Sequence, residues 1–335
     1  MEITIIIPTR NRAEILKKTL DSINNLNSFD LEWEVLIIDN ASTDDTKDVV
    51  NRISKESNYP IRYIYEKNVG LHFARNRAVT ETKSNIVAYL DDDVVVEPNW
   101  LKGAVCIREN KCEAVIGKIL PLWEITPPKY VLEFLRGGIY GPYSILDCGE
   151  KRIHDFKYFF GGNLFILRDI IIKLKGFHPD GFPQKDIIYR GDGEGGFFRK
   201  FSKAGYRCYY EPEAAIYHVI PSERINLNYL KRRYYNQGIS DSFTKIRKLY
   251  EVDKINTLSK KNISLSIIYH ILILIYNACK GVCTLLTFNH VNKYGIIKLI
   301  LLFNSLKGYY FHQSKVIKNT DLFHWVIKDN YLTNE

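Results

Sequence analysis

The chain has 335 residues and a mass of 39.1 kDa, with 46% hydrophobic and 25% charged residues. This composition indicates a folded protein of one large or two modest domains, and it excludes disordered, collagen-like and coiled-coil chains. The charge is uneven, because residues 1–221 contain 30 Lys and Arg against 31 Asp and Glu, whereas residues 222–335 contain 17 against 7 and are net +10.

The N-terminus and the cysteines predict a cytosolic protein. Met1 runs into an isoleucine-rich segment with no basic region and no small-residue cleavage site, so we expect a first β-strand and no signal peptide. The cysteines form no C-x-x-C pair, and we expect them to be reduced, buried thiols. They are Cys106, Cys112, Cys148, Cys208, Cys279 and Cys283.

Strand-like and helix-like segments alternate over the first hundred residues, which is typical of βαβ units around a parallel sheet. Continuous apolar runs predict strands at residues 3–7, 33–38, 61–65 and 86–90. Helical spacing predicts helices at residues 12–26, 42–53 and 71–82. Ser42 is the expected cap of the second helix. Ligands of such sheets bind at the carboxyl ends of the strands.

The pattern changes after residue 100. Residues 101–221 contain short apolar runs and many Gly and Pro residues, which predicts that the same domain continues and forms the second side of a cleft. A helix is expected at residues 197–204. Beyond residue 221 the sequence predicts helices, including 227–235 and 262–279, and no further βαβ unit.

Three consecutive carboxylates, Asp91, Asp92 and Asp93, follow the predicted strand at residues 86–90. They repel one another unless a cation lies between them. Oxygen ligands of this kind suit Mg²⁺ or Mn²⁺, which in turn can hold a diphosphate. The alternative interpretation is an acidic turn before a helix near Pro98.

Three further features favour a nucleotide site. Asp39 ends another predicted strand, where it can accept a hydrogen bond from a base or cap a helix. Arg75 lies about one turn into a helix opened by Gly70, and it can pair with a phosphate or a carboxylate. Asp192 and Glu194 lie in a glycine-rich segment before a predicted helix.

In this order the segments resemble the inverting family 2 glycosyltransferases of the GT-A fold, over roughly residues 3–218. The family's motifs appear as PTRNR at 8–12, DNASTD at 39–44, NxGxxxARN at 68–76, DDD at 91–93, GGN at 161–163, an acidic motif at 191–196 and PxAxxxH at 212–218. The resemblance implies an α/β fold with a Rossmann-like mixed sheet flanked by helices. It divides residues 1–221 into a nucleotide-sugar half, 1–100, and an acceptor half, 101–221, followed by a basic, mostly helical region at 222–335.

The resemblance also implies site residues. Those expected to bind the nucleotide sugar are Pro8, Thr9, Arg10, Asp39, Asn68, Gly70, Arg75, Asn76, Asp91, Asp92, Gly162 and Asn163. Among them, Asp39 would accept the base N–H, Arg75 and Asn76 would flank the diphosphate, and Asn163 would bind sugar hydroxyls. The expected ligands of Mg²⁺ or Mn²⁺ are Asp93, Asp91 and His218.

The acceptor motif departs from the family pattern. The family usually carries Glu-Asp before the helix, whereas Gly193 and Glu194 occupy those positions here. Glu194 is therefore the first candidate for the catalytic base and Asp192 the second. The base would take the proton of an acceptor hydroxyl as that oxygen attacks the anomeric carbon.

The sequence thus predicts a metal-dependent inverting glycosyltransferase of hexosyltransferase type. It would move a sugar from a nucleotide-diphospho-sugar, a UDP-sugar first, to a hydroxyl of a glycan or lipid-linked acceptor in surface polysaccharide biosynthesis. One alternative is a catalytically silent sugar-nucleotide-binding or scaffold subunit, against which the intact acids and His218 argue. A nucleotidyltransferase would require a glycine-rich loop, which residues 8–12 lack.

The basic C-terminal region leaves three alternatives open. Residues 262–279 are 18 uncharged residues near the lower limit of a membrane span, and Lys298 interrupts the apolar run at 295–303. Helices lying on an anionic membrane surface are the first expectation, packing or homo-oligomer helices the second, and a true span the third. We expect a cytoplasmic protein, peripheral on the inner face of the cell membrane. The basic-aromatic stretch 229–235 resembles a nucleic-acid patch, but we expect no nucleic-acid partner.

Overall fold

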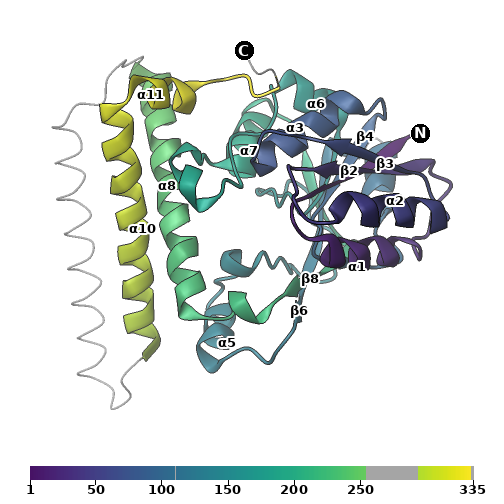
Figure 1. Ribbon diagram of the computed structural model, residues 1–335, viewed down its shortest axis with the longest axis horizontal. Helices are drawn as coiled ribbons and strands as arrows, with labels where there is room; N and C mark the ends of the chain where they lie inside the picture. The colour runs from purple at the N-terminus through teal and green to yellow at the C-terminus, as the bar shows by residue number, and fades with distance from the viewer. Residues whose placement is uncertain (110, 254–292, 333–335) are drawn as a thin grey trace.

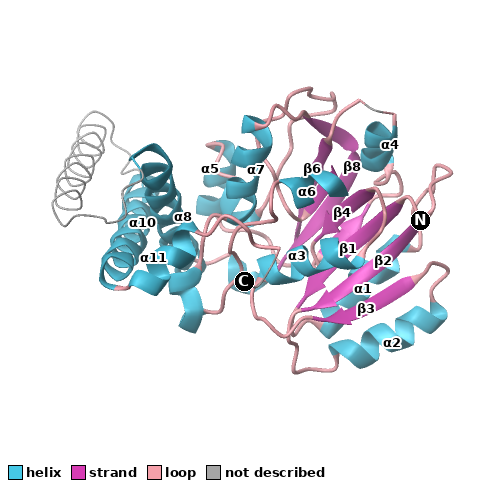
Figure 2. Cartoon of the chain, turned by 90° about the horizontal axis from the view of Figure 1, so that it is seen from above, coloured by secondary structure: helices cyan, strands magenta, loops and turns pink. Residues whose placement is uncertain are grey.

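The computed structural model of the chain describes residues 1–109, 111–253 and 293–332. Within these residues, an eight-stranded sheet carries helices on both faces, and a group of C-terminal helices lies to one side (Figures 1 and 2). The strand order is β3-β2-β1-β4-β7-β6-β8-β5. One core lies between the sheet and α1, α2 and α4, and a second lies between the sheet and α3, α6 and α7.

The first half of the sheet is parallel. Its strands are β1 (Ile3–Thr9), β2 (Trp33–Asp39), β3 (Ile61–Tyr65) and β4 (Ile86–Leu90), and its helices are α1 (Ala13–Ile23), α2 (Thr46–Glu56) and α3 (Leu71–Glu81). The four predicted strands are confirmed. Thr9 pairs with Asp39 at the ends of β1 and β2, and the acidic triplet follows β4 at the same edge.

The second half of the sheet is mixed. Its elements are β5 (Val94–Val96), α4 (Lys102–Arg108), β6 (Ala114–Trp123), α5 (Lys129–Arg136), η1 (Gly141–Tyr143), β7 (Asn163–Leu167), α6 (Arg168–Lys173), η2 (Gln184–Tyr189), α7 (Gly193–Lys203), β8 (Cys208–Ile220) and η3 (Ser222–Arg224). β7 runs antiparallel to both β4 and β6, whereas β6 and β8 are parallel. β8 also pairs with β5, where His218 lies opposite Val94. This pairing places His218 beside Asp93 of the acidic triplet.

Three helices are described after the sheet: α8 (Leu227–Asp253), α10 (Lys293–Lys318) and α11 (Thr320–Ile327). α8 and α10 approach closely where Gly238 meets the carbonyl of Ser305 and Gly308 meets that of Tyr235. α11 is tied to η2 by the Trp325 indole, which donates to the Tyr189 carbonyl at 2.9 Å. No helix in the described ranges is long and apolar enough to cross a membrane. The predicted helix at 262–279, Cys279 and Cys283 lie outside the described residues.

The helix boundaries correct two predictions. α2 begins at Thr46 and Ser42 does not cap it, because the Asp44 carboxylate accepts the Thr46 N–H at 3.2 Å while the Ser42 hydroxyl accepts the Asn11 N–H at 2.9 Å. α7 begins at Gly193 rather than at residue 197, so Glu194 lies in its first turn.

The four described cysteines are free thiols, as expected. Three of them, Cys106, Cys112 and Cys208, are buried, but Cys148 is exposed, contrary to the prediction. It lies on the loop between η1 and β7, outside both cores.

Candidate active site

Two adjoining cavities lie at the carboxyl ends of the parallel strands. The β1 cavity, of about 730 Å³, is lined by Pro8, Thr9, Arg10 and the acidic triplet 91–93, among others. The α7 cavity, of about 480 Å³, is lined by Arg75, Gly161, Gly162 and Glu194, among others. Both are lined by Leu71, Asp91, Ser144, His218 and Arg233. A molecule that occupied both cavities would have its central part at these shared residues.

Asp92 ties the end of β4 to the end of β1. The Thr9 hydroxyl donates to Oδ2 of Asp92 at 2.7 Å, and the Arg12 guanidinium donates to Oδ1 at 2.7 Å. Burial raises the pKa of Asp92 to about 6, although Arg12 opposes the shift. Because both carboxylate oxygens have protein partners, Asp92 holds the strand ends together.

Asp93 faces His218 across the β1 cavity, with Nε2 of His218 3.5 Å from Oδ1 of Asp93. Arg224, at the end of η3, lies 3.1 Å from each of these side chains. Burial raises the pKa of Asp93, but the hydrogen bond and charge of His218 together with Arg224 and Arg12 outweigh it and hold that pKa well below its usual range. Asp93 is therefore a permanent negative charge at the cavity wall.

The His218 ring has a defined tautomer. Its Nδ1 lies 2.8 Å from the carbonyl oxygen of Tyr143, which can only accept, so Nδ1 carries the proton. The Nε2 atom, on the other side of the ring, faces Asp93 and lies 3.1 Å from Nη1 of Arg224. A histidine held in this way is suited to ligate a metal through Nε2.

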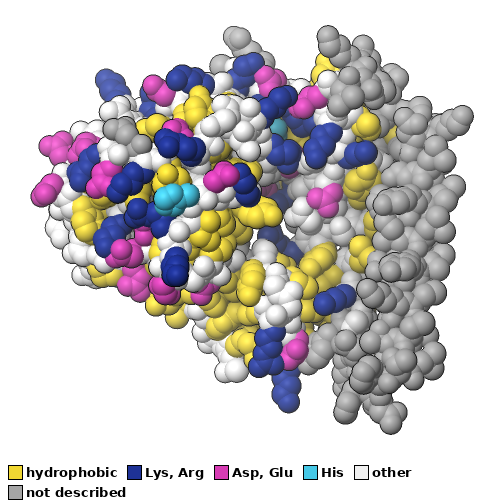
Figure 3. All heavy atoms as spheres, turned by 180° about the vertical axis from the view of Figure 1, so that it is seen from behind, with side chains coloured by type: hydrophobic (Ala, Val, Ile, Leu, Met, Phe, Trp, Pro, Cys, Tyr) yellow, Lys and Arg dark blue, Asp and Glu magenta, His cyan; other side chains and the backbone are white. Residues whose placement is uncertain are grey.

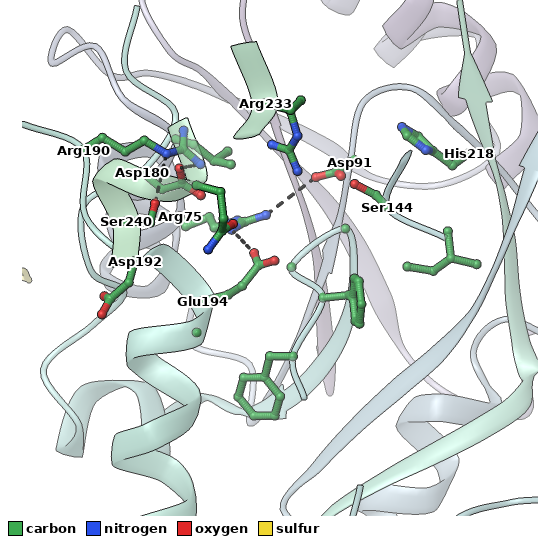
Figure 4. Close-up of a pocket in the computed structure, with 18 of the residues that line it drawn as sticks. Arg75, Asp91, Ser144, Asp180, Arg190, Asp192, Glu194, His218, Arg233 and Ser240 are labelled. Carbon is green, nitrogen blue, oxygen red and sulfur yellow. Dashed lines mark hydrogen bonds and ion pairs between the residues drawn. The ribbon is translucent and has the colours of Figure 1, made fainter. Parts of the chain in front are cut away.

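Asp91 and Glu194 lie on either side of one buried guanidinium (Figure 4). Arg75 donates to Glu194 at 3.0 Å, and its other terminal nitrogen lies 3.6 Å from Asp91. Burial opposes the charge on Arg75, but Glu194 and then Asp91 outweigh it and raise its pKa. Burial raises the pKa of Glu194, and Arg75 reduces this shift without cancelling it. Glu194 is therefore a stronger base than an ordinary glutamate.

The loop before β7 can lie on this trio because it lacks side chains. A Cβ atom at Gly161 would collide with the Arg75 guanidinium, and one at Gly162 would collide with the Asp91 carboxylate. The absence of a Cβ atom at these glycines therefore lets the backbone approach Arg75 and Asp91 closely.

Asp192 and Glu194 have different surroundings, and Figure 4 shows them pointing to different sides. His178 and Thr244 each contact the Asp192 carboxylate at 2.7 Å, and Arg199 pairs with it as well. Burial raises the pKa of Asp192, but His178 and then Arg199 outweigh it and hold that pKa well below its usual range. Both acids line the α7 cavity, but Asp192 joins α7 to α8 through contacts at both of its oxygens, whereas the described contacts of Glu194 are with Arg75.

Asn40 holds the segment of Asn68 and Gly70, two residues predicted to bind the nucleotide sugar. Asn40 itself was assigned no role from the sequence. Its amide donates to the Asn68 carbonyl at 2.6 Å and accepts the Gly70 N–H at 2.8 Å. Asp39 is buried beside it and accepts from the Tyr63 hydroxyl at 2.6 Å and the Ser42 N–H at 2.8 Å. Asn68 and Gly70 thus shape this end of the sheet through their backbone.

The structure does not bring the amides of Asn76 and Asn163 to a cavity. Asn76 donates to the carbonyls of Phe177 and Tyr331 at 3.0 and 3.1 Å, so it anchors the C-terminal segment. Asn163 is fully buried, where it accepts from the Trp100 indole at 2.8 Å and donates to two backbone carbonyls. Each amide makes contacts within the protein core instead of the predicted contact with a sugar nucleotide.

Asp93 and His218 fit part of a divalent-metal site. The described residues contain no group of three or more His, Cys, Asp or Glu side chains able to hold a metal ion. Oδ1 of Asp93 and Nε2 of His218, which lie 3.5 Å apart, nevertheless match two ligands of Mn²⁺, while Oδ2 of Asp93 is paired with Arg12 and Arg224. Such ions commonly take their remaining ligands from substrate phosphates and water. Asp91, the third predicted ligand, lines the same cavity but is paired with Arg75.

Several arginines of the site were not assigned by sequence reasoning. Arg12 stands in the motif at 8–12 without a role, and its spacing from the strand end was the available signal. Arg190 pairs with Asp180 at 2.8 Å in the wall of the α7 cavity. Arg224 and Arg233 come from the region after β8, where no local pattern indicated that they face the site.

Comparison with known proteins places this geometry in context. Residues 4–121 match the family model for glycosyl transferase family 2. The chain is 22% identical over 248 residues to the glucosyl-dolichyl phosphate glucuronosyltransferase of Haloferax volcanii, covering 72% of this chain and 76% of that one. It is 24% identical over 241 residues to the succinoglycan biosynthesis protein ExoM of Rhizobium meliloti, covering 71% and 73%.

A solved structure shows the same fold. The mannosyltransferase PcManGT from Pyrobaculum calidifontis, in complex with GDP-Man and Mn²⁺, superimposes with a TM-score of 0.57 at 17% sequence identity, covering 92% of this chain and 87% of that one. The predicted GT-A fold is confirmed.

Proposed function

Because the chain belongs to the family 2 glycosyltransferases, we propose that it transfers a sugar, with inversion, from a nucleotide-diphospho-sugar to a hydroxyl of a glycan or lipid-linked acceptor. The observation that carries this proposal is the junction of the two cavities at Asp91, His218 and Arg233. A donor in the β1 cavity would place its anomeric carbon at this junction. An acceptor in the α7 cavity would reach the same carbon from the side of Glu194.

The β1 cavity supplies groups suited to a nucleoside diphosphate. Thr9 and Arg10 line it at the end of β1. Asp39 ends the neighbouring strand but is not among the lining residues, so a base N–H would have to compete for it with the Tyr63 hydroxyl and the Ser42 N–H. Asp93 and His218 would hold Mg²⁺ or Mn²⁺, which when bound neutralises the charge that develops on the departing diphosphate. UDP is the nucleotide we expect.

Glu194 is proposed as the catalytic base. Its carboxylate would take the proton of the acceptor hydroxyl while the new bond from oxygen to the anomeric carbon forms and the bond from that carbon to the phosphate oxygen breaks. Its raised pKa favours this role, and the ion pair with Arg75 favours its deprotonated form. The saturated contacts of Asp192 support a positioning role for that residue.

We further propose an acceptor and a location. The Haloferax relative's name states that it acts on a dolichyl phosphate-linked sugar, and the Rhizobium relative's name states a role in succinoglycan biosynthesis. These names support a lipid-linked or polysaccharide acceptor of surface glycan synthesis. The basic region at 222–335, added to a catalytic domain at 1–221, supports a peripheral position on the inner face of the cell membrane.

The test is a panel of nucleotide sugars screened by thermal shift with and without Mn²⁺, followed by transfer assays with lipid-linked acceptors. A donor at 100 times its Kd should add roughly 2.7 kcal/mol of stability. Asp93→Asn should lose the part of this shift that depends on Mn²⁺, while Asp169→Asn, at an exposed position, should keep it. Absence of any shift and any transfer across the panel would contradict the proposal.

A further inference from the structure

Helix α8 turns a polar face toward the two cavities. The α8 residues that line them recur every three or four positions, so they share one face of the helix. They are Tyr229, Arg233, Gln237, Ser240, Asp241 and Thr244, with Arg232 beside them. A helix that only covered a core would present apolar side chains on that face. This face is therefore built to meet a polar ligand.

Arg233 is the α8 residue that lines both cavities, and Figure 4 shows it pointing toward Asp91. Its recorded hydrogen bond runs from Nη2 to the Gly141 carbonyl and is long, at 3.4 Å. No carboxylate of the described residues forms an ion pair with it, whereas Arg12, Arg75, Arg190 and Arg199 each have one.

Two other guanidinium groups of the β1 cavity share this property. Arg232 lies over the Tyr229 ring, 5.7 Å from its centroid, without a carboxylate partner among the described residues. Arg10, directly after β1, has a buried Nε atom without a hydrogen-bond partner. Three guanidinium groups that line the β1 cavity, those of Arg10, Arg232 and Arg233, thus form no ion pair with an acid of the described residues.

We propose that Arg233, assisted by Arg232, binds a phosphate group at the junction of the two cavities. The planar guanidinium fork binds two phosphate oxygens at once, which makes arginine suited to this ligand. The inference rests on the proposed function, in which phosphate has two sources there. One is the diphosphate of the donor nucleotide, and the other is the phosphate of a lipid-linked acceptor.

The experiment uses the full chain with Arg233→Ala, Arg233→Lys and, as a matched control, Lys231→Ala, which changes a basic residue of the same helix that lines neither cavity. Binding of UDP, UMP and inorganic pyrophosphate is measured by calorimetry with Mn²⁺ present, and thermal melting verifies folding. If the donor diphosphate is the ligand, Arg233→Ala weakens binding of UDP and pyrophosphate about tenfold or more and leaves UMP unchanged. Arg233→Lys restores part of the loss, and Lys231→Ala matches the wild type.

The acceptor arm separates the two sources. If the acceptor phosphate is the ligand, Arg233→Ala leaves UDP binding unchanged and raises the KM for a polyprenyl phosphate-linked acceptor about tenfold, with kcat retained. Unchanged binding of every probe and an unchanged KM would overturn the inference. If the wild type bound pyrophosphate but no nucleotide, the proposed function would fail, and the loss of pyrophosphate binding in Arg233→Ala would still support the role of Arg233.

Discussion

The α/β body and the C-terminal helical region differ in how their charged side chains are paired at the cavities. In the body, helices such as α1 and α3 pack on the sheet, and several charged side chains that line the cavities form ion pairs with one another, as Arg12 does with Asp92 and Arg75 with Glu194. In the helical region, α8 presents Arg233 to the cavities without a carboxylate partner among the described residues. The charged groups of the body are therefore held in place by one another, while α8 contributes a positive charge that a negatively charged ligand can pair with.

This difference bears on how the net charge of residues 222–335 is distributed between the cavities and the outer surface. Part of the net +10 of residues 222–335 does not face solvent, because Arg224 and Arg233 line the cavities and Arg247 is buried, where it donates to the carbonyls of Val326 and Lys328. Figure 3 shows acidic and basic side chains interspersed over the surface of the body. The basic residues of a sequence segment can thus line a cavity rather than cover the outer surface.

The largest effect is expected from Asp93→Ala in the body. Transfer should fall by about 10³-fold or more, because a divalent ion would lose its carboxylate ligand and the diphosphate charge would be uncompensated. Initial rates with and without a chelator measure this. Asp169→Ala, at a side chain that is 76% exposed, is the control. Full activity of Asp93→Ala, or indifference to the chelator, would break the metal assignment.

Substitutions of the two acids of the acceptor motif should affect different quantities, kcat for Glu194 and the free energy of unfolding for Asp192. Glu194→Gln should lower kcat by about 10²-fold or more with donor affinity nearly unchanged, because the carboxylate meets the acceptor proton. Asp192→Asn should reduce kcat less but lower the free energy of unfolding by on the order of 3 kcal/mol, because it disrupts a buried ionic cluster. Kinetics and denaturant melts measure both. The reverse order of effects on kcat would exchange the two roles.

The seam between α8 and α10 can be tested at its glycines. Gly238→Ala should lower the free energy of unfolding by about 1–3 kcal/mol, because the added methyl group would collide with the Ser305 carbonyl. Gly295→Ala in α10 is the matched control, since open space surrounds that position and alanine favours a helix. Equal melting of the two variants would show that the helices do not pack as described.

Arg75 should set the acid limb of the pH–rate profile. The proposed base, Glu194, must be deprotonated to act, and its pKa is raised by burial and lowered in part by Arg75. Activity should therefore fall as the pH decreases through that raised pKa. Arg75→Gln removes the lowering contribution, so the limb should move to higher pH. Profiles of kcat against pH decide this, with melting curves to verify folding; a limb that moved to lower pH would contradict the assignment.

The smallest effect is expected at the outer surface of the helical region. Full-length protein should sediment with anionic vesicles, and more weakly at high salt, because attraction to the surface is screened. Replacing the exposed residues Lys315 and Lys318 of α10 with Gln should weaken binding by roughly thirtyfold, at about 1 kcal/mol for each charge near the surface. Replacing Arg233 should not weaken it, because that residue faces inward. Protein that stays in the supernatant at low and high salt would favour packing or oligomer contacts for these helices.

Sequence by itself determined the parallel half of the fold and the strand-end acids. Continuous apolar runs separated by helical periodicity specify buried parallel strands, and Asp39 and the acidic triplet follow such runs directly. Because each acid ends or directly follows a strand, and the carboxyl ends of parallel strands meet at one edge of the sheet, the sequence placed these acids at that edge. The ordered motifs then indicated the GT-A fold, which the comparison with a solved structure confirmed.

Only the tertiary structure decided which of these groups face a ligand. Arg75 meets Glu194 across 119 positions of sequence, and Asn76 meets Tyr331 across 255, so no local pattern could distinguish a cavity residue from a core residue. Asp192 and Glu194 are two residues apart and both line the α7 cavity, yet on either side of the turn at Gly193, with φ +48°, Asp192 meets His178 and Arg199 while Glu194 meets Arg75. Side-chain direction depends on such long-range packing, and the sequence pattern does not record it.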